Sequence, residues 1–161
     1  MSSKPTNVII AGLGGQGVLK ASDILADVAF HAGLDVKKSE VHGMSQRGGS
    51  VASDVRFGER VFSPMVPEGE GDFLVVIAPD QVDVNRAALA HGGILIDPSQ
   101  IDESSITSKK SINVALLGVL SRYLPFSVEA WTAAIARNLP AKLKDTNLRS
   151  FSIGRASEKE N

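Results

Sequence analysis

The residues with the clearest chemical potential form the stretch GLGGQG at residues 12–17. Three of its glycines follow the G-x-G-x-x-G spacing, in which backbone N–H groups and the N-terminus of a following helix face an anion, most often a phosphate. Each glycine costs about 0.5–1 kcal/mol relative to alanine, so four of them cost about 2–4 kcal/mol and require a reason. The candidate cofactor-binding residues of this turn are Gly12, Gly14, Gly15, Gln16 and Gly17.

Two explanations fit the glycine turn. Either it binds a phosphate-bearing ligand, or its glycines let the chain turn sharply and let the first helix pack closely on a sheet. A dinucleotide site would also need an acid near the end of the second strand, and Glu40 is close to that place. The residues after Glu40 would compete with an adenosine ribose for this space, so both explanations stay open.

A second glycine-containing loop, EVHGMSQRGGS, spans residues 40–50. Arg47 can bind a phosphate or carboxylate through two hydrogen bonds while the adjacent glycines admit the ligand, although an arginine on an exposed turn is the commoner case. His42 is a candidate for acid–base chemistry or a partner contact, although a lone loop histidine usually does neither. The residues expected to contact a partner or ligand are Glu40, His42, Met44, Arg47, Gly48, Gly49 and Ser50.

The composition excludes several classes of function. The chain has 161 residues and no cysteine, which rules out disulfides, cysteine-ligated iron–sulfur clusters and thiol nucleophiles within it. A formal net charge of -1 gives no electrostatic basis for binding nucleic acid or an anionic membrane. No apolar run approaches the roughly 20 residues of a membrane span, and the N-terminus does not resemble a signal peptide. We expect a cytoplasmic protein.

The sequence predicts no catalytic residue and no metal ligand. It contains no G-x-S-x-G motif and no recognisable arrangement of serine, histidine and aspartate. Its three histidines are scattered, which does not predict a metal site. The two glycine loops are therefore interpreted as a binding or docking surface.

The elements that position the glycine turn follow from hydrophobic periodicity. Residues 7–11, NVIIA, are typical of a buried strand. Apolar residues at three- and four-residue steps after Gly17 predict an amphipathic helix that ends at Gly33. Residues 34–41 predict a second strand, so the segment forms one βαβ unit.

The rest of the chain predicts a hairpin, two buried strands and several helices. Residues 51–57 alternate in polarity and turn at Gly58 and Glu59 into a return strand at 60–63, followed by a loop at 64–72. Strands are predicted at residues 73–79 and 93–97, around a helix over 80–92. Further helices are predicted at residues 112–124, at 127–139 with Ser127 as N-cap, and at 141–154.

This pattern predicts a single α/β domain over residues 1–161 with three layers. Helices would cover both faces of a mainly parallel, Rossmann-like sheet, and the antiparallel hairpin would lie at one side.

Three stretches of this chain together resemble a known family. They are GGQG at residues 14–17, SEVHGMSQRGGSV at 39–51 and FSPMVPEGEGD at 62–72. The chain is similar to the small subunit of indolepyruvate:ferredoxin oxidoreductase and, more broadly, to the gamma domain of the pyruvate and 2-oxoacid:ferredoxin oxidoreductases. The likeness resumes at residues 112–135 and continues to 154. It is interrupted after residue 102, where the family usually carries a longer segment.

The resemblance implies a division of labour between subunits. Enzymes of this family oxidatively decarboxylate a 2-oxoacid with thiamine diphosphate, pass electrons through iron–sulfur clusters to ferredoxin, and transfer the acyl group to coenzyme A. It implies that thiamine diphosphate and the clusters belong to a large partner subunit. The present chain would be a non-catalytic subunit, inactive alone, that shapes access for the substrate or coenzyme A and meets the large subunit through residues 40–50, with Arg47 as the main anchor.

Two other functions remain open from the sequence. The chain could be a free-standing dinucleotide- or coenzyme-binding protein that uses the glycine turn. It could also be a purely structural interaction module, in which the glycines serve packing alone.

Overall fold

A computed structural model of the chain describes residues 4–42 and 49–157. Within these ranges, one five-stranded sheet has the order β2-β3-β1-β4-β5. Strand β3 pairs antiparallel with β1 and with β2, whereas β1 pairs parallel with β4, and β4 with β5. Four of the five described strands therefore point the same way, which confirms the mainly parallel α/β prediction. The strands are β1 (Thr6–Leu13), β2 (Asp35–His42), β3 (Ser50–Gly58), β4 (Gly71–Val76) and β5 (Leu89–Ile96).

The predicted hairpin between residues 51–57 and 60–63 is wrong. Residues 60–63 form no strand, and β3 instead lies between β1 and β2. The middle of the strand shows this directly, because Val55 lies opposite Val8 of β1 and opposite Lys38 of β2. Both edges of β3 are thus paired within the sheet, and neither is left for a return strand.

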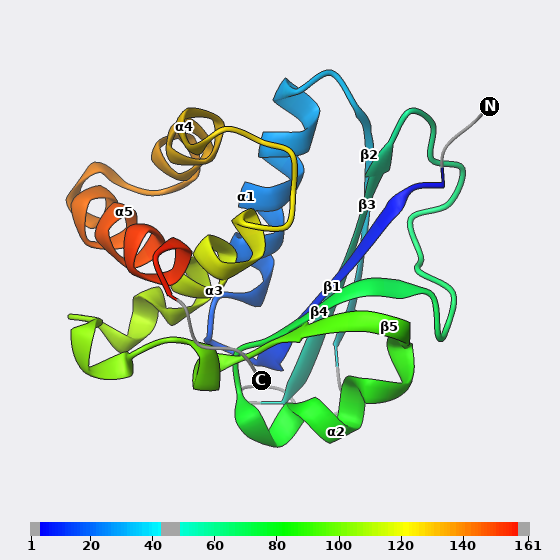
Figure 1. The fold of residues 1–161 in the computed structure, drawn as a ribbon, viewed down its shortest axis with the longest axis horizontal. Coiled ribbons are helices and arrows are strands. Elements are labelled where there is room, and N and C mark those ends of the chain that lie inside the picture. Colours follow the sequence, from blue (N-terminus) through cyan, green and yellow to red (C-terminus); the bar gives the residue numbers. More distant parts are fainter. Residues whose placement is uncertain (1–3, 43–48, 158–161) are drawn as a thin grey trace.

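Four helices lie together on one side of the sheet (Figure 1). They are α1 (Val18–His31), α3 (Ile112–Ser121), α4 (Val128–Asn138) and α5 (Ala141–Arg155). Helix α1 ends as predicted, because Gly33 has a φ of 87° and the Leu34 N–H donates to the Ala29 carbonyl, which satisfies the end of the helix. The Ala130 N–H donates to the Ser127 hydroxyl at 3.1 Å, which confirms Ser127 as the N-cap of α4.

The main core lies between these helices and the sheet. Ile10 of β1 and Ile24 of α1 are fully buried there, together with Leu116, Trp131 and Phe151 from α3, α4 and α5. Nine of the ten residues of α3 are buried, which fits a helix whose sequence is apolar on nearly every side.

The opposite face of the sheet has a much thinner cover. Val66 from the loop after β3, and Val82 and Ala88 from a short helical segment, pack there against β1 and β4. That segment consists of η1 (Pro79–Gln81), α2 (Val82–Asn85) and η2 (Arg86–Ala88). The predicted helix over 80–92 is therefore too long, because β5 begins at Leu89, four residues before the predicted strand, and Leu89 pairs with Gly71.

The segment between β5 and α3 contains no strand in the described chain. It forms three 3-10 turns, η3 (Pro98–Gln100), η4 (Glu103–Ser105) and η5 (Lys109–Ser111). Among the described residues, none of the helices combines the length and the apolarity needed to cross a membrane.

Candidate functional site at the glycine turn

The glycine turn joins the carboxyl end of β1 to the start of α1. Gly15 and Gly17 have φ values of 89° and 81°, in the left-handed region that favours glycine. Gly17 is the N-cap of α1 and offers the helix no side-chain cap. The first N–H groups of α1 have no acceptor within the helix, and they carry the positive end of its dipole.

Gln16 and Gly12 shape the turn from inside. The Leu13 N–H donates to the Gln16 Oε1 atom at 2.7 Å, and the Gln16 N–H donates back to the Leu13 carbonyl at 3.1 Å. A Cβ at Gly12 would lie 2.8 Å from that Oε1 atom and 3.1 Å from Val18 Cγ2. The geometry thus gives both residues a packing role, whether or not a ligand binds nearby.

Asn113 of α3 contacts the turn and was missed by sequence reasoning. Its Nδ2 atom donates to the Gly17 carbonyl at 3.1 Å, and a Cβ at Gly17 would collide with the same atom. The side chain is 5% exposed, and its Oδ1 atom has no hydrogen-bond partner among the described residues. The sequence contains one indication of this contact, a single asparagine near the start of the otherwise apolar run INVALL.

Two pockets open beside the turn and share Lys20. The first has a volume of about 290 Å³ and lies between the turn, the first residues of α1 and Val51 of β3. The second has a volume of about 210 Å³ and lies between the turn, Lys110, Asn113 and the first half of α5. Lysine ammonium groups and free helix N–H groups attract the same kind of ligand, a phosphate or another anion.

The end of the second glycine loop lies against the turn. The Gly14 N–H donates to the buried Gly49 carbonyl at 2.8 Å, and the Ser50 hydroxyl donates to Gln81 Oε1 at 2.7 Å. The structure therefore brings Gly49 and Ser50 together with the glycine turn, although the two stretches are far apart in the sequence. The predicted contacts Met44, Arg47 and Gly48 lie outside the described residues, and of His42 the structure describes the backbone at the end of β2.

Glu40 does not lie where a dinucleotide site needs an acid. It is exposed on the edge strand β2, with its carboxylate 3.6 Å from Lys38 Nζ. Strand β3 separates β2 from β1, so Glu40 lies two interstrand spacings, about 10 Å, from the strand that leads into the turn. In a Rossmann dinucleotide site the second strand is the direct neighbour of the first.

The Asp27 carboxylate of α1 binds this helix to α4. The Asp27 carboxylate accepts hydrogen bonds from Arg137 at 2.8–3.2 Å and from Asn138 at 2.6 Å. Burial raises the pKa of Asp27, but these hydrogen bonds, with the charges of Arg137 and His31, outweigh burial, so the pKa lies below its usual value. Within the described chain, no group of three His, Asp or Glu side chains is placed to hold a metal ion.

Comparison with known proteins identifies the family. Residues 7–101 match the family model described as pyruvate ferredoxin/flavodoxin oxidoreductase. The chain belongs to this family. Its relatives include the indolepyruvate oxidoreductase subunit IorB of Thermococcus kodakarensis, 34% identical over 98% of both chains, and that of Archaeoglobus fulgidus, 32% identical over 92% of both. A further relative is the pyruvate/ketoisovalerate oxidoreductases common subunit gamma of Thermococcus kodakarensis, 34% identical over 61% of this chain and 54% of that one.

Solved structures of two oxoacid:ferredoxin oxidoreductases share the fold. The gamma subunit of a keto/oxoacid ferredoxin oxidoreductase from Geobacter sulfurreducens superposes with a TM-score of 0.78 at 23% identity, covering 92% of this chain and 95% of that one. A 2-oxoglutarate:ferredoxin oxidoreductase from Magnetococcus marinus superposes with a TM-score of 0.81 at 20% identity, covering 96% of this chain and 31% of that one. These likenesses support the α/β assignment.

The alignment also shows a difference in length between this chain and one relative. The alignment with the IorB subunit of Thermococcus kodakarensis spans 197 positions, more than the 161 residues of this chain. That relative therefore carries residues that this family member lacks, and the family-model match ends at residue 101.

Proposed function

We propose that this chain is the small, non-catalytic subunit of a 2-oxoacid:ferredoxin oxidoreductase that acts on indolepyruvate or a related aryl pyruvate. The complex would oxidatively decarboxylate the 2-oxoacid to an acyl-coenzyme A and pass the electrons to ferredoxin. The observation that carries the proposal is the match to IorB subunits along nearly the whole length of both chains. We further propose that residues 1–161 form one gamma-type domain and that the complex is cytoplasmic.

The iron–sulfur clusters of such a complex do not fit the residues of this chain. Iron–sulfur clusters are usually held by cysteine thiolates, and the sequence has no cysteine. We therefore assign the clusters to a large partner subunit. From the family resemblance we assign thiamine diphosphate to the same subunit, with ferredoxin as its electron acceptor. No catalytic step is assigned to a residue of this chain.

For the glycine turn we propose a role in binding a phosphate group of coenzyme A. The free N–H groups at the start of α1, the left-handed Gly15 and the shared Lys20 support this role, and Lys110 adds a second cation. The Magnetococcus marinus enzyme, whose structure contains this fold, is described with 2-oxoglutarate, coenzyme A and succinyl-coenzyme A bound.

The second loop, residues 40–50, is proposed to contact the large subunit beside this ligand. Its support is the hydrogen bond from Gly14 to Gly49, which fixes the end of the loop at the turn. Met and Arg are enriched at protein interfaces, and the loop contains Met44 and Arg47. Among the residues of this loop, Arg47 is the one whose replacement should most weaken assembly with the large subunit.

The test is reconstitution of the complex from this chain and a co-expressed large subunit. We expect ferredoxin reduction with indolepyruvate and coenzyme A from the complex, and none from the isolated chain. Turnover by the isolated chain would contradict the non-catalytic assignment. Micromolar binding of NAD or FAD by the isolated chain would instead favour a free-standing dinucleotide-binding protein.

The coenzyme A role is tested separately with Lys20→Ala and the control Lys37→Ala on the edge strand β2. A hydrogen bond to a charged group is worth about 1.5–3 kcal/mol, so Lys20→Ala should raise the KM for coenzyme A about tenfold or more, with kcat nearly unchanged. The control should leave KM as in the unmodified complex. Equal KM values for the two variants would favour the structural role, in which the glycines serve packing alone.

A further inference from the structure

The loop at residues 59–70, between β3 and β4, exposes large apolar side chains. It contains no helix or strand along its twelve residues, and loops of this length usually have a function. Phe62 is 86% exposed and Met65 is 58% exposed, whereas Val61 and Val66 of the same loop turn toward the protein. The loop therefore packs Val61 and Val66 against the protein and presents two other apolar residues to solvent.

Polar side chains from three strands hold this loop in one conformation. Arg56 of β3 donates from Nη1 to the Ser63 carbonyl at 2.9 Å and to the Met65 carbonyl at 3.2 Å, and from Nε to Asn7 Oδ1 at 2.8 Å. Two carboxylates accept backbone N–H groups of the loop. Asp54 accepts from Val66 at 2.9 Å, and Asp35 accepts from Val61 at 2.8 Å. Exposed apolar side chains on a loop held this way lose little entropy when a partner covers them.

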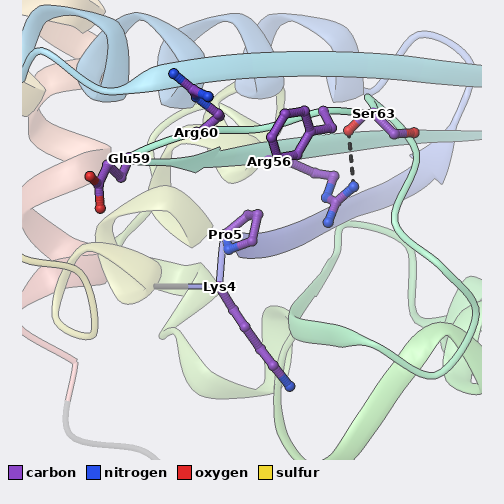
Figure 2. A pocket seen from close by; sticks show the side chains of 7 residues that line it. Lys4, Pro5, Arg56, Glu59, Arg60 and Ser63 are labelled. Atoms are coloured by element: carbon purple, nitrogen blue, oxygen red, sulfur yellow. Dashed lines mark hydrogen bonds between the residues drawn. The ribbon is translucent and has the colours of Figure 1, made fainter. Parts of the chain in front are cut away.

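A pocket of about 740 Å³ adjoins Phe62, and most of its charged residues are cations. Lys4, Arg56 and Arg60 line it, and Glu59 is its single acidic residue among the described ones. The Arg60 guanidinium carbon lies 5.9 Å from the centre of the Phe62 ring. Figure 2 shows Lys4 and Pro5 on one side of the pocket, Arg60 on the other, and Arg56 between them reaching Ser63.

This surface lies at the opposite end of the sheet from the glycine turn. Strand β1 runs from Thr6, next to the pocket residues Lys4 and Pro5, to Leu13, where the turn begins. A contact made at residues 59–70 therefore does not itself cover the candidate ligand pockets.

We propose that Phe62, Met65, Arg60 and Lys4 form a docking surface for an acidic segment of the large subunit that carries an apolar side chain. This inference rests on the proposed function, because it names the large subunit as the occupant. The argument for the occupant is complementarity. The cations around the pocket would pair with carboxylates of the partner. Phe62 and Met65 would be additional apolar anchors of the interface, covered by an apolar side chain of the partner.

The experiment measures assembly of the complex by titration calorimetry, with Phe62→Ser compared against Phe30→Ser. Phe30 is a matched control, because it is 67% exposed on α1, on the helical side of the sheet. Phe62→Ser should raise the dissociation constant at least about tenfold, as expected for an anchor residue, while Phe30→Ser leaves it unchanged. Both variants should melt at the temperature of the unmodified chain.

Charge reversal tests the chemistry of the partner. Arg60→Glu should weaken assembly and flatten its dependence on salt, whereas Arg86→Glu, an exposed arginine in the helical segment before β5, should change neither. If the complex forms and Phe62→Ser and Arg60→Glu bind as well as their controls, the docking surface is wrong while the proposed function stands. If the unmodified chain does not bind the large subunit, both are wrong. Self-association that Phe62→Ser abolishes would identify a second copy of this chain as the occupant and overturn the proposal.

Discussion

Replacing Gly17 by alanine should destabilise the protein more than the same change at Gly15. Both glycines have positive φ, so an alanine at either position pays about 1–2 kcal/mol for the left-handed conformation. A Cβ at Gly15 would meet no atom within 4 Å, whereas one at Gly17 would collide with the Asn113 side chain. In the Gly17→Ala variant, Asn113 must therefore move away and lose its hydrogen bond to the Gly17 carbonyl. This loss lowers the free energy of unfolding by about a further 0.5–1.5 kcal/mol.

The expected difference between the two variants is therefore about 1 kcal/mol. For a chain of this size, that corresponds to a melting temperature about 2–4 °C lower for Gly17→Ala than for Gly15→Ala. The measurement is thermal and urea unfolding of the purified chain, followed by circular dichroism. An Asn113→Ala background supplies the control, because the hydrogen bond is already absent there.

In that background the two alanine variants should become equally unstable, since the coupling between Gly17 and Asn113 has been removed. Equal melting temperatures of the single variants, or an unchanged difference in the Asn113→Ala background, would refute the reasoning. Either result would mean that the asparagine does not set the cost of a side chain at Gly17.

Three further predictions concern the rest of the fold. Gly154→Ala should lower the melting temperature, because its Cβ would collide with a backbone carbonyl of α3, and overpacking costs about 1–3 kcal/mol against a helix-propensity gain of about 1 kcal/mol. Arg137→Ala should destabilise the protein at pH 7 and progressively less as the pH falls below 3.8, measured by urea unfolding. The pKa of Asp27 lies below its usual 3.8 in the folded state, so the stability it contributes is present above that value and is lost as the pH falls through the folded pKa. Asp54→Asn should make the protein at least as stable at pH 7, because burial raises the pKa of Asp54 and the wild type loses stability as the pH rises from 3.8 through that raised value. Urea unfolding of the two proteins at pH 4 and pH 7 measures this, and greater stability of the wild type at pH 7 would contradict it.

The sequence was sufficient for features that depend on neighbouring residues. The glycine turn between β1 and α1, the end of α1 at Gly33 and the Ser127 cap follow from backbone preferences and hydrogen bonds that span a few positions. The depth of α3 follows from its composition, because a helix that is apolar on every side must be buried. The family resemblance likewise depended on short, continuous motifs.

The predicted hairpin failed because strand pairing is not local. The alternation in residues 51–57 predicts a strand with one buried face, but it does not say which strands pair with its two edges. The long loop after β3 could also be taken for a turn plus a return strand. Its conformation is set by Arg56 and Asp54, which bind its backbone from the face of the sheet.

The sequence determined one part of the candidate site, and the tertiary structure determined the rest. The sequence by itself determined that a glycine turn would open a helix and leave N–H groups free for an anion. Only the tertiary structure decided that β3 would separate Glu40 from the turn, and that Asn113 would lie against Gly17 from 96 positions away. The physical reason is that contacts between distant residues depend on how the sheet and helices pack as a whole, which no local pattern of residues encodes.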